Sequence, residues 1–246
     1  FRTPFDVCVD VEGNVYVSDF ENQYIRRIDT DGTVSTVAGN GIAGYVDGPS
    51  ATAQFNYPRG IVIDATGNLY VSDSWNHRVR KIDASGEVST YAGGGSIFGV
   101  QSVSEFKDGS DTSARFYTPC GLSIDDIGNI YVADAYNHRV RKIDLSQYVS
   151  TVAGTGISGA AGGGFVDGDI SVARFNTLTE LFVSGTGTIY VSDTYNNRIR
   201  KIENGIVSTL AGSGVAGYLD GPDSLAKFNH PRGVVLDGSA HSILVC

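Results

Sequence analysis

The chain of 246 residues is poor in several residue types, and each shortage excludes a class of protein. It contains no methionine, six prolines and three cysteines. Three cysteines are too few for a disulfide-rich scaffold, and their odd number leaves at least one of them unpaired within the chain. The longest apolar stretches are much shorter than the roughly 18 residues that a membrane-spanning helix needs. We therefore expect no membrane insertion.

Basic residues are also in short supply. The 18 Lys and Arg residues face 27 Asp and Glu residues, which gives a net charge of −9. This is the wrong sign for attraction to nucleic acid, so we expect no nucleic-acid partner. Because methionine is missing even at position 1, we expect that a leader has been removed or that the chain belongs to a longer polypeptide. A secreted or cell-surface protein is the location that we predict.

Glycine and aromatic residues, in contrast, are abundant. The chain has 32 glycines, 13 tyrosines and 11 phenylalanines, and 41% of its residues are hydrophobic. Much glycine with little proline indicates many tight turns, and the hydrophobic content is too high for a disordered chain. These features predict a β-rich fold with a large core.

Internal repetition is the strongest signal in the sequence. A segment with the pattern Gly-Asn/Thr-x-Tyr-Val-Ser/Ala-Asp occurs at residues 13–19, 67–73, 128–134 and 187–193. A basic strand and then a strand ending in Ala-Gly follow each copy. An element D-G-x4-A-x-F-x2-P starts at Asp47, Asp108 and Asp167, with leucine as its last residue in this third copy, and again at Asp220. It leads into a short apolar strand, so each unit holds four short strands, the composition of one β-propeller blade.

The strings Asn-His-Arg-Val-Arg-Lys-Ile at 76–82 and 137–143 resemble NHL repeats, and 22–24 and 196–198 are degenerate copies. The resemblance implies an all-β fold, a single β-propeller domain over 1–246. Its blade units are predicted as four full blades and a partial fifth, at 1–54, 55–115, 116–174, 175–227 and 228–246. NHL propellers usually close with about six blades, so we expect further polypeptide, another chain, or an unusual open arc.

Loop lengths predict which face binds a partner. The blade bodies are nearly constant in length, whereas the loops at 94–107 and 155–166 are long. Insertions in repeat proteins commonly mark the binding face. The predicted binding face therefore carries these loops and the aromatic residues beside them. These are Phe20, Trp75, Phe98, Tyr136 and Tyr195.

The recurring Asp and Arg residues are interpreted as structural. A ring of carboxylates could suggest metal or acid-base chemistry, and an Arg stripe could suggest RNA binding. A catalytic residue, however, is needed once, whereas a turn cap or an ion pair is needed in every blade. We expect one Arg per blade to pair with the Asp of its neighbouring strand. The residues are Asp19, Asp73, Asp134, Asp193, Arg80, Arg141 and Arg200.

Histidines His77, His138 and His230 raise a zinc hypothesis, because the peptide-amidating lyases resemble NHL propellers with a histidine-held metal. Here, however, Gln23 and Asn197 fill the same repeat position as the first two histidines. Zinc needs three or four converging ligands, and no closely spaced pair offers them. We expect no metal at these histidines.

The innermost strands break the repeat at the mouth of the central channel. Just before these strands, glycine is replaced by Asp6 and Glu180. One position earlier the residues do not follow the repeat: they are Phe5, Arg59, Cys120, Thr179 and Arg232. Asp6 and Glu180 could hold a cation or pair with Arg59 and Arg232, and we favour the ion pairs.

We therefore predict a non-enzymatic, rigid interaction or scaffold module that binds protein partners, other domains of its own polypeptide or another subunit, through one propeller face. It would be part of a larger extracellular or surface protein and would need no cofactor. The alternative is a propeller hydrolase or lyase with a divalent cation, Ca²⁺ or Zn²⁺, at the channel mouth. Elemental analysis and substitution of Asp6 or Glu180 would separate the two.

Overall fold

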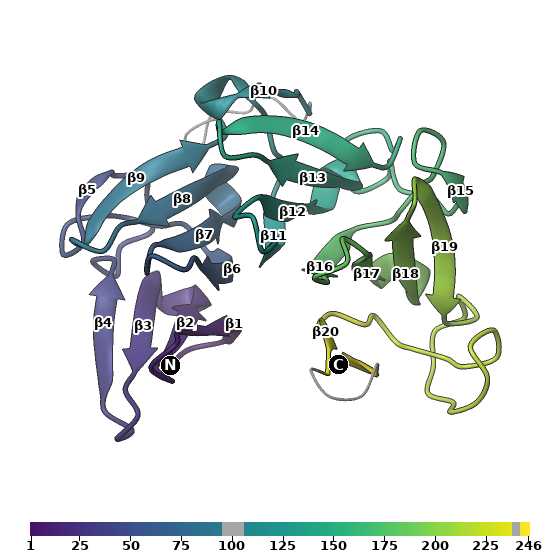
Figure 1. The fold of residues 1–246 in the computed structure, drawn as a ribbon, viewed down its shortest axis with the longest axis horizontal. Helices are drawn as coiled ribbons and strands as arrows, with labels where there is room; N and C mark the ends of the chain where they lie inside the picture. Colours follow the sequence, from purple (N-terminus) through teal and green to yellow (C-terminus); the bar gives the residue numbers. More distant parts are fainter. Residues whose placement is uncertain (95–105, 238–241) are drawn as a thin grey trace.

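The computed structural model describes residues 1–94, 106–237 and 242–246, and its regular secondary structure consists almost entirely of short antiparallel strands. The sheets are arranged as blades around a centre (Figure 1). The predicted all-β propeller with four-stranded blades is therefore confirmed. The N-terminal and C-terminal blades, purple and yellow, lie on the two sides of an opening in the ring (Figure 1).

Each of the first four blades is an antiparallel sheet whose strands run in chain order from the centre outward. The first blade has β1 (Pro4–Val9), β2 (Val15–Asp19), β3 (Tyr24–Ile28) and β4 (Val34–Ala38). The second has β6 (Pro58–Ile63), β7 (Leu69–Asp73), β8 (Arg78–Ile82) and β9 (Glu87–Ala92). The third has β11 (Pro119–Ile124), β12 (Ile130–Asp134), β13 (Arg139–Ile143) and β14 (Tyr148–Ala153). The fourth has β16 (Leu178–Val183), β17 (Ile189–Asp193), β18 (Arg198–Glu203) and β19 (Ile206–Ala211), and the last sheet pairs β20 (Val234–Leu236) with β21 (Ile243–Val245).

A short fifth strand at the outer edge of the second, third and fourth blades is an addition that the repeat pattern did not predict. These strands are β5 (Gly48–Pro49), β10 (Gly109–Ser110) and β15 (Gly168–Asp169). Each pairs with the outer strand of the blade that follows it in the sequence. The Asp-Gly element before each of these blades therefore forms part of that blade's sheet.

The turn between the first two strands of a blade is built on an aspartate. The Oδ1 atom of Asp64 accepts hydrogen bonds from the backbone amides of Thr66 and Asn68, both at 2.9 Å, and its Oδ2 accepts one from the Asn68 side chain at 2.8 Å. Burial opposes ionisation of Asp64, but these hydrogen bonds lower its pKa to about 2. Gly67, with φ of 83°, supplies the left-handed residue that the turn requires.

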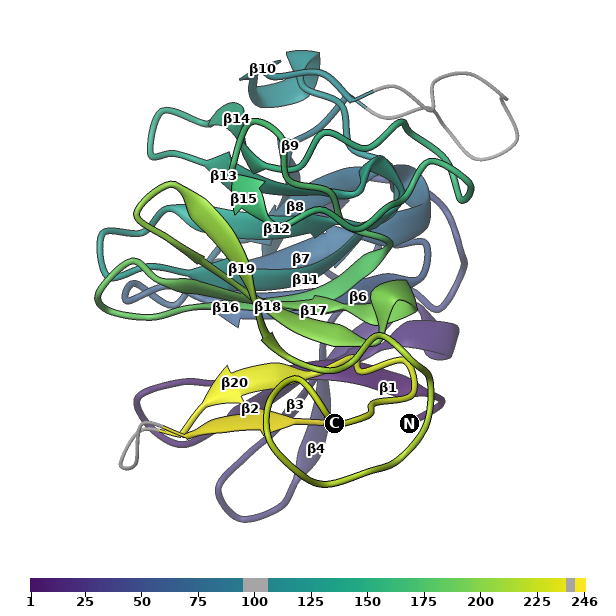
Figure 2. The same cartoon turned by 90° about the vertical axis from the view of Figure 1, so that its right-hand side faces the viewer.

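A one-turn 3-10 helix follows the second strand in each of these four blades. The helices are η1 (Phe20–Asn22), η2 (Ser74–Asn76), η4 (Ala135–Asn137) and η5 (Thr194–Asn196), and η3 (Asp111–Ser113) lies in a linker. In the edge-on view of Figure 2 they lie on the same side of the ring, opposite the hairpin turns on its other side. They therefore form much of one propeller face.

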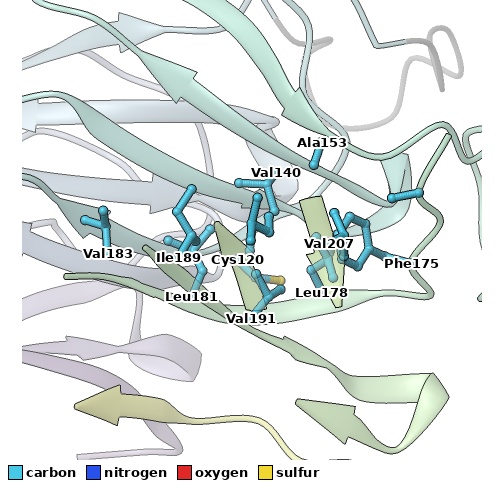
Figure 3. Packing of buried hydrophobic residues seen from close by; sticks show 14 residues of the cluster. Cys120, Val140, Ala153, Phe175, Leu178, Leu181, Val183, Ile189, Val191 and Val207 are labelled. Carbon is cyan, nitrogen blue, oxygen red and sulfur yellow. The ribbon is translucent and has the colours of Figure 1, made fainter. Parts of the chain in front are cut away.

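The hydrophobic core lies between neighbouring blades. Phe175 of the linker is fully buried and packs with Leu178 and Val207 of the fourth blade and with Val140 and Ala153 of the third (Figure 3). Phe55 and Phe116 are buried in the same way at the two preceding junctions. Full burial of a phenylalanine contributes about 1.5–3 kcal/mol. Each linker phenylalanine thus holds two blades at a fixed angle.

Candidate functional site

The repeated Asp and Arg residues form ion pairs around buried arginines in the second, third and fourth blades, which we call the inner blades. Arg141 is fully buried, and its Nη1 lies 2.7 Å from Asp134 Oδ2 while its Nη2 lies 2.7 Å from Asp108 Oδ1. Asp134 comes from the same blade, whereas Asp108 comes from the linker before it. The equivalent sets are Arg80 with Asp73 and Asp47, and Arg200 with Asp193 and Asp167. Each of these three fully buried arginines, which we call the clamp arginines, binds two carboxylates through its guanidinium group.

The repeat histidines hold the backbone of the next unit. His138 Nδ1 accepts a hydrogen bond from the Thr177 amide at 3.0 Å, and its Nε2 lies 2.8 Å from the Gly159 carbonyl. His77 Nδ1 likewise accepts the Thr118 amide at 3.0 Å. Burial lowers the pKa of both histidines, so the neutral imidazole that these bonds require is favoured.

Other residues fill the histidine position when they supply the same acceptor. Gln23 Oε1 accepts the Tyr57 amide at 2.6 Å, and Asn197 Oδ1 accepts the His230 amide at 3.0 Å. The position therefore needs an acceptor atom, and it has no need of an imidazole. His77 and His138 use their Nδ1 atoms for this purpose.

Aromatic residues of the predicted binding face lie together on the side that carries the 3-10 helices. The ring centroids of Phe20 and Tyr57 are 4.8 Å apart, and those of Tyr57 and Trp75 are 4.4 Å apart. Phe5 extends this row, with its centroid 5.9 Å from that of Phe20. Trp75 remains 43% exposed. The result is a continuous aromatic surface across two blades.

The remaining predicted face residues lie further round the same side. Tyr195 is 50% exposed and its ring packs edge-on against His230, with centroids 5.3 Å apart. Tyr136 is half-buried and lies 5.3 Å, centroid to centroid, from Tyr117. Phe98 and most of the 94–107 loop lie outside the described residues.

A pocket of about 380 Å³ opens on this face at the centre of the ring. Part of its lining is the non-repeating position, to which every unit contributes one residue; the structure places this position at the second residue of β1, β6, β11 and β16 and just before β20, whereas the sequence had placed it ahead of the strands. Those five residues are Phe5, Arg59, Cys120, Thr179 and Arg232. The other lining residues come from the 3-10 helices and from the turns before the inner strands, namely Ala135, Tyr136, Thr194, Tyr195, Thr118, Thr177 and His230. Within the described part of the chain, no Asp or Glu lines it.

The ion pairs that we favoured at the channel mouth are not formed, so that prediction was wrong. Among the described residues, neither Asp6 nor Glu180 lies within 4.0 Å of a guanidinium nitrogen of Arg59 or Arg232. Arg59 instead donates from Nη1 to Cys120 Sγ at 2.9 Å. Its guanidinium also lies 5.2 Å from the Phe5 ring centroid and 5.3 Å from that of Phe20.

The carboxyl groups of Asp6 and Glu180 are held by the inner strands. Asp6 accepts the Ile61 amide at 2.9 Å and the Val7 amide at 2.8 Å, and Glu180 accepts the Leu181 amide at 3.1 Å. Burial raises the pKa of Asp6 to about 6. Burial, and next the charge of Asp6, raise the pKa of Glu180 well above its usual range.

The alternative with a divalent cation requires further ligands near these two carboxyl groups. In the described residues, no group of three or more His, Cys, Asp or Glu side chains is placed to share an ion. Burial and the charge of Asp6 instead favour the protonated form of Glu180, because neutralising one of two nearby acids relieves their repulsion.

Sequence reasoning placed Arg59, Thr179 and Arg232 at the channel mouth, but it missed Thr118 and Thr177 and considered His230 only as a metal ligand. Thr118, Thr177 and His230 all have positive φ values, between 53° and 57°, and precede the inner strands in three different units. A signal for them was present in the sequence. They occupy the same repeat slot as Tyr57, two residues before the non-repeating position that we had singled out.

The fold and this central pocket define the class, a β-propeller whose innermost strands meet at a channel. The NHL repeat family model matches residues 55–82 and 116–143, which are the start and first three strands of the second and third blades. The chain belongs to the NHL-repeat β-propellers.

Relatives that match most of this chain are much longer proteins. It is 29% identical over 209 residues to Protein SUPPRESSOR OF QUENCHING 1, chloroplastic, from Arabidopsis thaliana, an alignment that covers 82% of this chain and 19% of that protein. It is 31% identical over 200 residues to NHL repeat-containing protein 2 from Bos taurus, which covers 76% of this chain and 26% of that protein. The chain thus spans about a fifth of the Arabidopsis thaliana protein and about a quarter of the Bos taurus protein.

A solved structure shows the same fold. An auxiliary nutrient binding protein from Bacteroides thetaiotaomicron superimposes with a TM-score of 0.70 at 18% identity, over 98% of this chain and 56% of that one. At this identity the likeness is one of fold. No helix in the described residues is long and apolar enough to cross a membrane.

Proposed function

We propose that this propeller is a non-enzymatic interaction module that binds a protein partner on the face bearing the 3-10 helices. One observation carries the proposal, the continuous row of Phe5, Phe20, Tyr57 and Trp75 rings beside the central pocket. Aromatic side chains are enriched in protein interfaces, where they bury much area at little conformational cost.

The aromatic residues are held rigidly. The backbone amides of Trp75, Tyr136 and Tyr195 each donate to a carbonyl of the segment before the inner strand of the same blade, at 3.1 Å. A surface fixed before binding loses less entropy on association. The short helices therefore present their aromatic side chains in a fixed arrangement.

Two further parts of the prediction belong to this proposal. The long relatives support a role within a larger polypeptide, where the partner could be another domain of the same protein. Secretion or surface display also stays a prediction, and the name of one relative places that protein in the chloroplast.

Site-specific photo-crosslinking tests the face. A photoreactive phenylalanine at Tyr195 should capture the partner in the native source. The same group at Ile127, 72% exposed in the turn between β11 and β12, should not, because the hairpin turns lie on the opposite side of the ring (Figure 2). Trp75→Ala should abolish the capture at position 195. Equal capture from both faces, or capture unaffected by Trp75→Ala, would contradict the proposal. Stoichiometric Ca²⁺ or Zn²⁺ that is lost on Glu180→Gln would instead support the hydrolase or lyase alternative.

A further inference from the structure

The central pocket has a chemistry that the proposed function does not explain. We propose that it binds a carboxylate group of the partner between Arg59 and Arg232, an inference that rests on the interaction role proposed above. The ligand would be an acidic side chain or a chain-terminal carboxylate next to an aromatic or apolar residue.

Arg59 is the first reason. It is partly buried, and in the described residues it has no carboxylate partner within 4.0 Å. The three clamp arginines, which are fully buried, each hold two carboxylates. Placing a charge in a partly enclosed site without a counter-ion costs free energy, and a bound anion would recover it.

The position of the Arg59 guanidinium is also fixed. Its Nη1 is held by Cys120 Sγ at 2.9 Å, and the rings of Phe5 and Phe20 lie beside it. Its Nε is buried and makes no hydrogen bond to any described residue. A planar guanidinium held in this way is preorganised for a carboxylate, which it binds through parallel hydrogen bonds.

Arg232 supplies the second positive charge. It lines the same pocket, is exposed, and forms no ion pair with a described residue. In a protein with a net charge of −9, a pocket with two arginines and no lining acid is a local reversal of sign. Such a site attracts anions, because no carboxylate in its lining opposes the positive charge of the arginines.

Hydroxyl groups complete the polar lining. Thr177 Oγ1 is buried and makes no hydrogen bond to a described residue. Thr179 Oγ1 and Thr194 Oγ1 lie 2.6 Å apart. A volume of about 380 Å³, walled by Phe5, Tyr136 and Tyr195, suits one large side chain with its charged end against the arginines.

Two matched small probes test the charge requirement. We would measure binding of 3-phenylpropionate and of its uncharged amide, 3-phenylpropionamide, by ligand-observed NMR. The acid should bind at least about tenfold more tightly than the amide, because charge-assisted hydrogen bonds are the strong ones. The affinity for the acid should fall as salt is raised from 50 to 500 mM, because salt screens the attraction between its carboxylate and the two arginines. Equal binding of acid and amide would overturn the proposal.

Variants locate the site. Arg232→Gln, at an exposed position, should preserve folding and weaken the acid about tenfold or more, and Arg59→Gln should do the same with unchanged amide binding. Arg27→Gln is the control, since Arg27 does not line the pocket, its side chain is 40% exposed, and its Nε lies 2.6 Å from Asp29 Oδ1. Acid binding that survives Arg232→Gln would refute the assignment even if the Arg59 variant fails to fold.

Further probes distinguish the source of the carboxylate. N-acetyl-phenylalanine represents a chain terminus, and N-acetyl-glutamate amide represents an acidic side chain. Inorganic phosphate binding as tightly as either would contradict a carboxylate-specific site. Because the crosslinking at Tyr195 uses neither arginine, its success together with failed acid binding would reject the carboxylate site alone, whereas failure of both would reject the interaction role as well.

Discussion

The first blade and the three inner blades carry the same Asp-Arg repeat but place it in different surroundings. Arg141 lies between two carboxylates at 2.7 Å, whereas Arg26 of the first blade lies 3.6 Å from Asp19 and its side chain is 23% exposed. The inner blades receive their second carboxylate from the Asp-Gly element of the unit before. Each of these ion-pair sets therefore uses residues of two consecutive units. Contacts of this kind couple the stabilities of neighbouring units in repeat proteins.

The largest loss of stability should come from replacing a clamp arginine of an inner blade. Arg141→Leu leaves Asp134 buried without its counter-ion and should lower the free energy of unfolding by about 3–5 kcal/mol. Arg26→Leu should cost about 1 kcal/mol or less, because its pair is long and partly solvated. Urea unfolding followed by circular dichroism would compare them. Similar losses for both variants would mean that the linker carboxylate adds nothing.

A smaller difference should separate the glycines of the inner strands. A Cβ at position 121 would lie 2.7 Å from the Glu180 Cα and would also meet the Glu180 carboxyl. Because backbone must move, Gly121→Ala should destabilise by about 1–3 kcal/mol. A Cβ at Gly233, near the open end of the ring, meets the Cys246 side chain, at 2.5 Å. Gly233→Ala should therefore destabilise the protein less than Gly121→Ala. Thermal unfolding of both variants would measure the difference in stability.

The repeat pattern predicted the blades because each strand, turn and linker recurs at matched offsets. It could not predict β5, since a two-residue strand at Gly48–Pro49 has no periodicity of its own and depends on the outer strand of the next blade. Residues 47–54 therefore act with the second blade, although they belong to the first sequence unit.

The candidate site shows the same division. Sequence position was enough to place Arg59 at the channel mouth, because the non-repeating residues stand out from the repeat. It did not reveal the partners of Arg59 and Asp6. Arg59 lies against Phe5 and Phe20, which its flat charged group can contact, and Asp6 accepts backbone amides that only the folded inner strands bring near.

The acceptor role of the repeat histidines predicts an intermediate effect. His77→Ala removes the acceptor for the Thr118 amide and should cost about 1 kcal/mol, whereas His77→Gln should be nearly neutral, since Gln23 serves the first blade in this way. Chemical unfolding at pH 7.5 compares the two variants. An equal loss in both would show that the ring packing matters more than the hydrogen bond.

The same histidines should make stability depend on pH. Their native pKa values are lowered, so below about pH 6.5 the unfolded chain takes up protons that the native state does not, and stability falls as the pH falls. Asp6, with its pKa raised to about 6, changes stability in the opposite direction between about pH 6 and 4, but it does so in every variant. The difference between wild type and His77→Gln/His138→Gln therefore isolates the histidines. The double variant should show a flatter decline between pH 6.5 and 5, and an unchanged slope would contradict the neutral-acceptor role.

The smallest effect on stability, and the largest on binding, should come from the aromatic face. Trp75 is 43% exposed and its ring contacts that of Tyr57, so Trp75→Ala should lower the free energy of unfolding by about 0.5–1 kcal/mol. Its loss from an interface typically costs 2 kcal/mol or more, about thirtyfold in affinity. Val172→Ala, at a 53% exposed linker position, is a control that should change neither quantity much. If the aromatic residues served only to pack the blades, Trp75→Ala would lower stability without weakening binding. The ratio of the binding loss to the stability loss therefore distinguishes a partner-binding role from a structural one.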